Sequence, residues 1–478
     1  MNKQFLKSNK WFSIITLISI SAIMLATIPF SVHILPDSDG YIVGAILREP
    51  LYPLIIMFFK SIFGEGFATP LFIFQNLLLS YSIWSLCLFL QEKFKLSKLI
   101  TTLNLGAFVA ILAIQPFLSA SNAVYSSTVL SEGITFALFF LIARFLLKAA
   151  FELSFKPLIP TGILVFIAIL TRFQMAYTLV LWLLVAVFVA VKTKTIKKYI
   201  LPILIATVGI FALTSVATKT YHFFKNGAFV STQFKDTSFL AKLVYTSEKE
   251  DADLFQTSPL LKETFLKIYE NSEKLGYLQT KETATFIGNC SHYEPHFDKI
   301  LAESILPLLY NLAFDEINNC TPVDARIFSQ KMAAEMNKKL FVDEFPSYLA
   351  LSANSAVFGL IRSNSFFQMR FPTFLNVILT AISFVGYATA FILIFLVYKK
   401  RRSCNSPFLN LFIIVSLLGN MAPYVLAQYL ANRYTTAFIP LFWVGLLILV
   451  CEFFRLFFPN SFLSKHFFNI KNNHLVQK

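Results

Sequence analysis

The stretch 158–191, LIPTGILVFIAILTRFQMAYTLVLWLLVAVFVAV, decides the fold. Its 34 residues contain one charged side chain, Arg172. A single helix of that length would be about 50 Å long, whereas the hydrocarbon core of a bilayer is about 30 Å thick. The polar pair Thr171-Arg172 lies near the middle of the stretch. The sequence therefore predicts two membrane-spanning helices, at 157–171 and 174–191, joined by a turn at this pair.

Apolar windows of similar length recur along the rest of the chain. Of its 478 residues, 56% are hydrophobic and 14% are charged, and the mean hydropathy is +0.65, which is too apolar for one soluble core. Unbroken apolar runs also exclude a membrane β-barrel, whose strands alternate between apolar and polar residues. The sequence therefore predicts an all-α polytopic membrane protein with about ten spans, near 11–34, 69–91, 99–117, 127–147, 157–171, 174–191, 199–217, 373–398, 406–427 and 434–457.

The distribution of Lys and Arg predicts the topology. With the N-terminus inside, the cytoplasmic segments hold 21 of the 41 basic residues and the short outer segments hold four. The long polar segment 218–372 holds the other 16, together with 18 acidic residues. This distribution follows the positive-inside rule. We therefore expect a multi-pass protein of the plasma (bacterial inner) membrane with cytoplasmic N- and C-termini, whose basic residues contact anionic membrane lipids and no nucleic acid.

The polar segment 218–372 is long enough to fold as a domain. Its apolar residues follow helical spacing, and Thr321-Pro322-Val323-Asp324 has the residue types of a helix N-terminus. We expect three parts: an N-terminal membrane module at 1–217 with a first outer loop at 35–65, a mainly helical extracytoplasmic domain at 218–372, and a C-terminal membrane module with a cytoplasmic tail at 373–478.

Cys290 and Cys320 are the two cysteines of the polar segment. An oxidising outer compartment favours a disulfide bond between them. Two free buried thiols are the alternative.

Polar side chains gather at the predicted outer ends of the spans. Arg offers a permanent charge and a planar fork that fits phosphate oxygens, and a carboxylate close to a hydroxyl group can act as a general base. Together they favour a site that holds a phosphate-bearing lipid and deprotonates an incoming hydroxyl. In the alternative interpretation, the aspartates cap a short helix and the arginines anchor the membrane interface. The set comprises Asp37, Asp39, Arg48, Tyr52, Ser131, Glu132, Arg172, Asn432, Arg433 and Tyr434.

The run Pro36-Asp37-Ser38-Asp39-Gly40-Tyr41, followed by Arg48-Glu49-Pro50-Leu51-Tyr52-Pro53-Leu54, resembles the first outer loop of GT-C glycosyltransferases that use polyprenyl-phosphate sugars. These enzymes include bacterial relatives of protein O-mannosyltransferases and of the lipid A aminoarabinose transferase. Further similar pieces, in matching order and spacing, are Leu130-Ser131-Glu132, Leu170-Thr171-Arg172 and Asn432-Arg433-Tyr434.

The resemblance implies a membrane glycosyltransferase that moves a sugar from a polyprenyl-phosphate carrier to a hydroxyl of an exported glycan, lipid or protein, with inversion. The acidic residue of this loop is the catalytic carboxylate of the superfamily, which implies Asp37 or Asp39 as the general base. No particular cofactor is expected, and a divalent metal ion is left open. The expected donor-phosphate and substrate contacts are Arg48, Tyr52, Glu132, Arg172, Arg433 and Tyr434.

Two other functions fit parts of the sequence. An O-antigen polymerase or ligase also has many spans and a large outer segment, and it would depend on arginines such as Arg326, Arg362 or Arg370, with Asp37 dispensable. A transporter would place ionisable groups near the bilayer midplane and often shows repeated halves. Here the polar groups lie at one boundary and no halves repeat, which disfavours a transporter.

Overall fold

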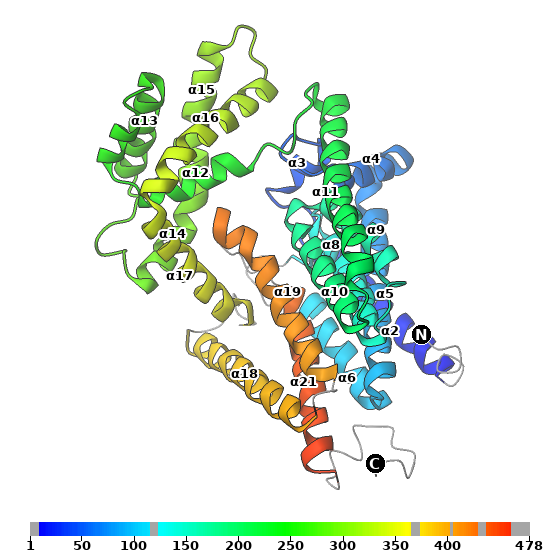
Figure 1. The fold of residues 1–478 in the computed structure, drawn as a ribbon. Helices are drawn as coiled ribbons and strands as arrows, with labels where there is room; N and C mark the ends of the chain where they lie inside the picture. Colours follow the sequence, from blue (N-terminus) through cyan, green and yellow to red (C-terminus); the bar gives the residue numbers. More distant parts are fainter. Residues whose placement is uncertain (1–8, 115–122, 365–372, 402–404, 429–435, 460–478) are drawn as a thin grey trace.

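The computed structural model describes the chain except residues 1–8, 115–122, 365–372, 402–404, 429–435 and 460–478 (Figure 1). Its described elements are helices. Ten of them overlap the ten predicted spans. The first helix ends earlier than predicted, the third ends at Val109 and is followed by a π-helical turn to Ile114, the fourth begins later, and the seventh ends later. Their bounds are Lys10–Ala26 (α2), Ala68–Phe94 (α5), Lys98–Val109 (α6), Glu132–Glu152 (α8), Leu158–Thr171 (α9), Tyr177–Lys192 (α10), Ile196–Asn226 (α11), Thr373–Lys400 (α18), Asn405–Ala427 (α19) and Phe438–Phe457 (α21).

Among the described residues, seven helical segments are long and apolar enough to cross a membrane. Two shorter apolar helices, Lys98–Ala113 and Leu158–Thr171, add to them. Large apolar side chains point outward from the bundle: on α11, Leu201, Val208 and Leu213 are 63%, 67% and 62% exposed. Exposed apolar surface of this extent matches contact with hydrocarbon. The chain is an all-α polytopic membrane protein.

The predicted turn inside the long apolar stretch is present. Helix α9 ends at Thr171, and Arg172 has an extended backbone with φ −160° and ψ 121°. A short 3₁₀ turn, Phe173–Ala176 (η5), leads into α10. The break leaves the Arg172 side chain at the end of the bundle instead of inside the bilayer, where an unpaired charge is costly.

Two of these differences have a visible local reason. The first helix stops at Ala26, and a 3₁₀ turn with Pro29 at its second position follows (Ile28–Phe30, η1). The seventh continues beyond the apolar residues to Asn226 and ends at Gly227, whose φ of +74° is the left-handed conformation that terminates helices. Helix α11 therefore carries the chain from the bundle into the inserted segment.

The inserted helices have a hydrophobic core of their own. Aromatic side chains such as Tyr245, Phe265, Tyr293 and Phe297 are buried in it. Thr321 and Asp324 form the expected capping box at the start of α16. The elements are Lys235–Thr246 (α12), Lys249–Phe255 (η6), Pro259–Lys274 (α13), Phe286–Lys299 (α14), Ile300–Ile305 (η7), Leu306–Glu316 (α15), Pro322–Asp343 (α16) and Phe345–Asn364 (α17).

The inserted helices dock on the C-terminal end of α19, at one end of the bundle (Figure 1). The last carbonyl groups of a helix have no partner within the helix, and its C-terminus attracts positive charge. Three side chains of the inserted helices donate hydrogen bonds to such carbonyls. Lys242 donates to Val425, Tyr348 to Leu426 and Tyr293 to Gln428.

The loop after the first span is tied to the end of α11 and to the segment that follows it. It contains two helices, Ser38–Ile42 (α3) and Leu51–Phe63 (α4). Between them, the buried carboxyl group of Glu49 accepts hydrogen bonds from Thr218 at 3.2 Å and from Thr232 at 2.7 Å. This loop and the inserted helices therefore lie at the same end of the bundle.

Candidate active site

The first loop holds an ion pair between Asp37 and Arg48, with 2.9 Å between Oδ1 and Nη2. The Asp37 side chain is 35% exposed and that of Arg48 is 19% exposed. The guanidinium group also stacks over the ring of Tyr41, 4.4 Å from its centroid. Asp37 occupies the N-cap position of α3, but its carboxylate makes no capping hydrogen bond. The capping role considered for this aspartate is therefore not formed, and its carboxylate is held by Arg48.

A second ion pair joins Glu132, the first residue of α8, to Arg172 after α9, with 2.6 Å between Oε1 and Nη1. The Glu132 residue is 2% exposed. Arg172 also donates from Nε to Oε1 of Gln174 at 2.9 Å. A buried charge close to a bilayer requires a partner, and each residue supplies one for the other. The N-terminus of α8 adds a favourable field for the carboxylate.

Tyr41 and Ser131 connect the two ion pairs. The hydroxyl groups of these residues are 2.9 Å apart, and Arg172 Nη1 donates to Ser131 Oγ at 3.3 Å. Three separate segments of the chain thus meet in one network: the first loop, the start of α8, and the turn from the end of α9 into η5. The network brings together four of the side chains expected in the site, Asp37, Arg48, Glu132 and Arg172.

Tyr52 supports this network from behind. It is fully buried, and its ring meets that of Tyr41 edge to face with 5.1 Å between centroids. Its hydroxyl donates to Gln75 Oε1 at 3.0 Å. Gln75 in turn donates to the carbonyls of Ser126 and Thr128. The hydroxyl of Tyr52 is thus bound to Gln75 below the surface, and its ring holds the ring of Tyr41 in place.

A small cavity of about 20 Å³ opens beside the Glu132–Arg172 pair. A cavity of this size has room for about one water molecule. Aromatic and polar side chains of α8, η5, α10, α19 and α21 line it, so that the C-terminal membrane helices complete the surroundings of this ion pair. The lining residues are Glu132, Thr135, Phe136, Phe139, Arg172, Gln174, Met175, Tyr177, Asn420, Tyr424, Ala437 and Phe438.

The remaining predicted residues have different surroundings. Asp39 is exposed in the first turn of α3. Arg433 and Tyr434 lie outside the described residues. Cys320 carries a free thiol in the described structure, and its Sγ lies 3.5 Å from the Thr321 carbonyl. The side chain of Cys290, the expected partner, lies outside the described residues. Cys320 stands at the end of the turn that leads into α16, and its local contact is with that backbone.

Arg326 is one of the arginines on which an O-antigen polymerase or ligase would depend. In the described structure it has a structural role. Arg326 is 4% exposed and donates from Nε to the carbonyl of Gln233 at 2.8 Å. It therefore links α16 to the segment before α12. Arg370 and the side chain of Arg362 lie outside the described residues.

The second half of the cavity wall was not predicted from the sequence. Tyr177, Asn420 and Tyr424 belong to spans that were predicted as plain membrane helices. Asn420 and Tyr424 are polar residues near the end of a mainly apolar helix, and such residues are the signal that could have revealed them. Ser131 stands in the quoted Leu130-Ser131-Glu132 motif, but its contact with Tyr41 could not be predicted from spacing alone.

No protein family model matches the sequence, and no curated protein matches it. Among solved structures, the chain is similar to ArnT from Cupriavidus metallidurans in the apo state, with 14% sequence identity and a TM-score of 0.31. That similarity covers 92% of this chain and 78% of that one. At this level of similarity no residue of that structure assigns a role to a residue of this chain, and the candidate site is defined by its own geometry.

Proposed function

We propose that this chain is a membrane glycosyltransferase that moves a sugar from a polyprenyl-phosphate carrier to a hydroxyl group of an acceptor outside the cytoplasm, with inversion at the anomeric carbon. The observation that carries the proposal is the joined network of two carboxylate–guanidinium pairs, Asp37–Arg48 and Glu132–Arg172, at one end of a lipid-facing bundle. The first-loop motif that resembles GT-C enzymes supplies half of this network.

The arginines would bind the phosphate of the donor. The planar guanidinium group of Arg172 forms one wall of the cavity, and its fork suits the oxygens of a phosphate ester. As the bond from the anomeric carbon to the phosphate oxygen breaks, the electron pair leaves with the lipid phosphate. Fixed positive charge at that oxygen stabilises the transition state. Arg433, from the sequence resemblance, is the further candidate for this role.

Asp37 would take the proton of the acceptor. The acceptor oxygen forms the new bond to the anomeric carbon from the face opposite the phosphate, and its proton passes to the carboxylate. Asp37 suits this step better than Asp39, because Arg48 holds its carboxylate in place while 35% of the side chain stays accessible. Carboxylates serve as general bases in inverting sugar transfer through oxocarbenium-like transition states.

The outer surface of the bundle would accommodate the lipid chain. Helices α9 and α11 expose large apolar side chains such as Ile159, Ile163 and Val208. A polyprenyl tail can therefore stay in the hydrocarbon while its headgroup reaches the end of the bundle. The excess of Lys and Arg in the segments at the other end supports an extracytoplasmic location for this site and for the inserted helices.

The proposal is tested with purified protein in proteoliposomes. The donor pool is the lipid-linked sugar fraction, labelled with radioactive sugars, from cells that lack the gene, and the acceptor is the envelope fraction of the same cells. We expect the wild-type protein to move label from the lipid fraction to the acceptor. Asp37→Asn is expected to reduce the initial rate at least about 100-fold, because it removes the base.

Asp39→Asn is the matched control, since it changes the same type of side chain two positions away. It should keep most of the activity, and neither variant should unfold more than about 4 °C below the wild-type temperature. Full transfer activity of Asp37→Asn, or loss of activity in Asp39→Asn alone, would contradict Asp37 as the base. Solute uptake by the proteoliposomes without consumption of any lipid-linked sugar would overturn the transferase function itself.

A further inference from the structure

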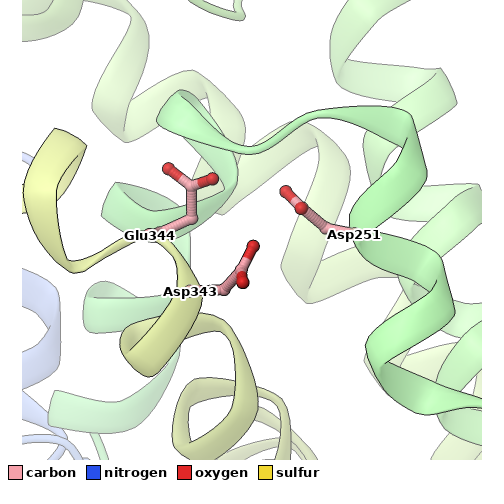
Figure 2. A group of neighbouring side chains, drawn as sticks. All are labelled: Asp251, Asp343 and Glu344. Atoms are coloured by element: carbon pink, nitrogen blue, oxygen red, sulfur yellow. The ribbon is translucent and has the colours of Figure 1, made fainter.

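Three carboxylates meet in the inserted helices, on elements that the candidate active site does not use. Asp251 belongs to η6, Asp343 is the last residue of α16 and Glu344 follows it at the joint with α17. One oxygen of each side chain lies within 4.8 Å of the others. Figure 2 shows Asp251 and Glu344 facing each other, with Asp343 pointing toward the space between them.

Glu344 brings an unsatisfied oxygen to this group. The residue is 8% exposed, and its Oε2 atom is buried without a hydrogen-bond partner in the described structure. A buried carboxylate oxygen without a partner is costly, so this position calls for a positively charged or donating ligand. Asp251 is also buried, and Oδ2 accepts the backbone N–H of Glu248 at 2.7 Å.

No described ion pair compensates the three negative charges. Lys339 stands one turn earlier on α16, but its ammonium group donates to the Leu254 carbonyl at 3.0 Å and to Thr257 at 3.2 Å. Concentrated, uncompensated negative charge of this kind is the electrostatic environment of a cation site.

We propose that Asp251, Asp343 and Glu344 bind a Ca²⁺ ion. All three offer oxygen, which hard cations prefer, whereas Zn²⁺ sites use mainly His and Cys. Ca²⁺ binds oxygen at about 2.3–2.6 Å, so two ligands of one ion can be up to about 5 Å apart, and Mg²⁺ requires about 4.2 Å or less. Three oxygens within 4.8 Å of one another fit around the larger Ca²⁺ ion with at most a small shift of a side chain, and water would complete its coordination shell.

The bound ion would fasten η6 to the joint between α16 and α17. Helix α17 begins at this joint, and four residues after Glu344 it supplies Tyr348, whose hydroxyl holds the end of α19. The Ca²⁺ ion would therefore stabilise the part of the insertion that docks on the membrane helices. This role is independent of sugar transfer.

The test uses the full-length protein in a non-ionic detergent after treatment with a chelator. Equilibrium dialysis with radioactive calcium counts the bound ions, and intrinsic fluorescence follows thermal unfolding. For the wild-type protein we expect one site with a dissociation constant of about 10⁻⁴–10⁻³ M, as in extracellular modules. Saturating Ca²⁺ should raise the unfolding temperature by about 3 °C or more.

Two variants remove the site in different ways. Asp343→Asn changes an exposed ligand, so it should leave the ion-free unfolding temperature unchanged and weaken Ca²⁺ binding at least about 10-fold. Glu344→Gln removes a buried charge, so in chelator it should unfold at or above the wild-type temperature, yet lose the response to Ca²⁺. Asp315→Asn, an exposed carboxylate on α15, is the control and should keep the full response.

Absence of Ca²⁺ binding by the wild-type protein would overturn the proposal. So would wild-type affinity in Asp343→Asn, which remains informative even if Glu344→Gln does not fold. An equal rise in unfolding temperature with Mg²⁺ at the same concentration would overturn the assignment to Ca²⁺.

Discussion

The hydroxyl groups of Tyr41 and Ser131 lie 2.9 Å apart, although the two residues are 90 positions apart in the chain. Both residues are buried. The Tyr41 ring carries the guanidinium group of Arg48, and Ser131 accepts a hydrogen bond from Arg172. This single contact therefore connects two ion pairs that come from distant parts of the sequence.

We predict that Tyr41→Phe slows sugar transfer about 5- to 10-fold. The variant keeps the ring that supports Arg48 but removes a hydrogen bond worth about 1 kcal/mol, and leaves Ser131 without this partner. The measurement is the initial rate of label transfer in proteoliposomes. Ser131→Ala should have a comparable effect, and the double variant should be little worse than either single one. Additive effects of the two substitutions would show that the contact does not couple the ion pairs.

A second prediction separates the two ion pairs by their stability. Glu132→Gln leaves the Arg172 charge without its buried carboxylate partner, so it should destabilise the protein by about 3 kcal/mol or more. Asp37→Asn breaks a partly exposed pair and should cost at most about 1 kcal/mol. Thermal unfolding in detergent measures both. Equal shifts for the two variants would contradict the difference in burial between the pairs.

The fold was predictable because the bilayer restricts which secondary structures can span it. Unbroken apolar runs can only be helices there, and the turn at Thr171-Arg172 followed from helix length against bilayer thickness. The end of α11 was placed too early, since its polar last turns from Thr218 onward are helical outside the apolar region. Hydropathy reports where a helix leaves hydrocarbon and contains no information about where the helix itself stops.

The candidate site was predictable only in its residue types. Charged residues at span ends pointed to Asp37, Arg48, Glu132 and Arg172, because such charges are costly near a bilayer unless they have a use or a partner. The pairing itself depends on how α8 and α9 pack, which local patterns do not contain. The burial of Lys242 could not be predicted either. In the sequence it looks like any basic residue of an amphipathic helix, but it is fully buried against α19.

A third prediction concerns this docking contact. Lys242 donates to the Ser352 hydroxyl at 2.7 Å and to the Val425 carbonyl, and its ammonium group lies 4.7 Å from the centre of the Tyr348 ring. Lys242→Met keeps the bulk but leaves the carbonyl without its donor. We expect the end of α19 to exchange amide hydrogen at least about 10-fold faster in this variant, because the helix terminus frays.

Lys339→Met is the matched control for Lys242→Met. Lys339 also donates to a backbone carbonyl, that of Leu254, but this contact lies within the inserted helices. Hydrogen exchange followed by mass spectrometry should therefore show unchanged protection at Val425 in this variant. Faster exchange at the end of α19 in both variants would indicate general loosening of the insertion rather than loss of a specific anchor.

The fourth prediction is a pH dependence that originates at Glu49. Burial, opposed by hydrogen bonds from Thr232 and Thr218, raises the pKa of this carboxyl group from 4.5 to about 7. The folded protein then binds the proton more tightly than the unfolded chain, so the stability that Glu49 contributes is fully present below about pH 4.5 and is lost as the pH rises through about 7. The full effect is at most about 3 kcal/mol.

Thermal unfolding of the wild-type protein and of Glu49→Gln in detergent, at steps from pH 5 to pH 8, measures this contribution by difference. The glutamine stays neutral, so its unfolding temperature should fall less with rising pH than that of the wild-type protein. Other groups contribute equally to both proteins and cancel: the raised pKa of Glu344 acts in the same direction, and the lowered pKa of Lys242 acts in the opposite one. Parallel pH profiles for the two proteins would mean that Glu49 is already ionised in the folded state, and that its threonine partners hold a carboxylate.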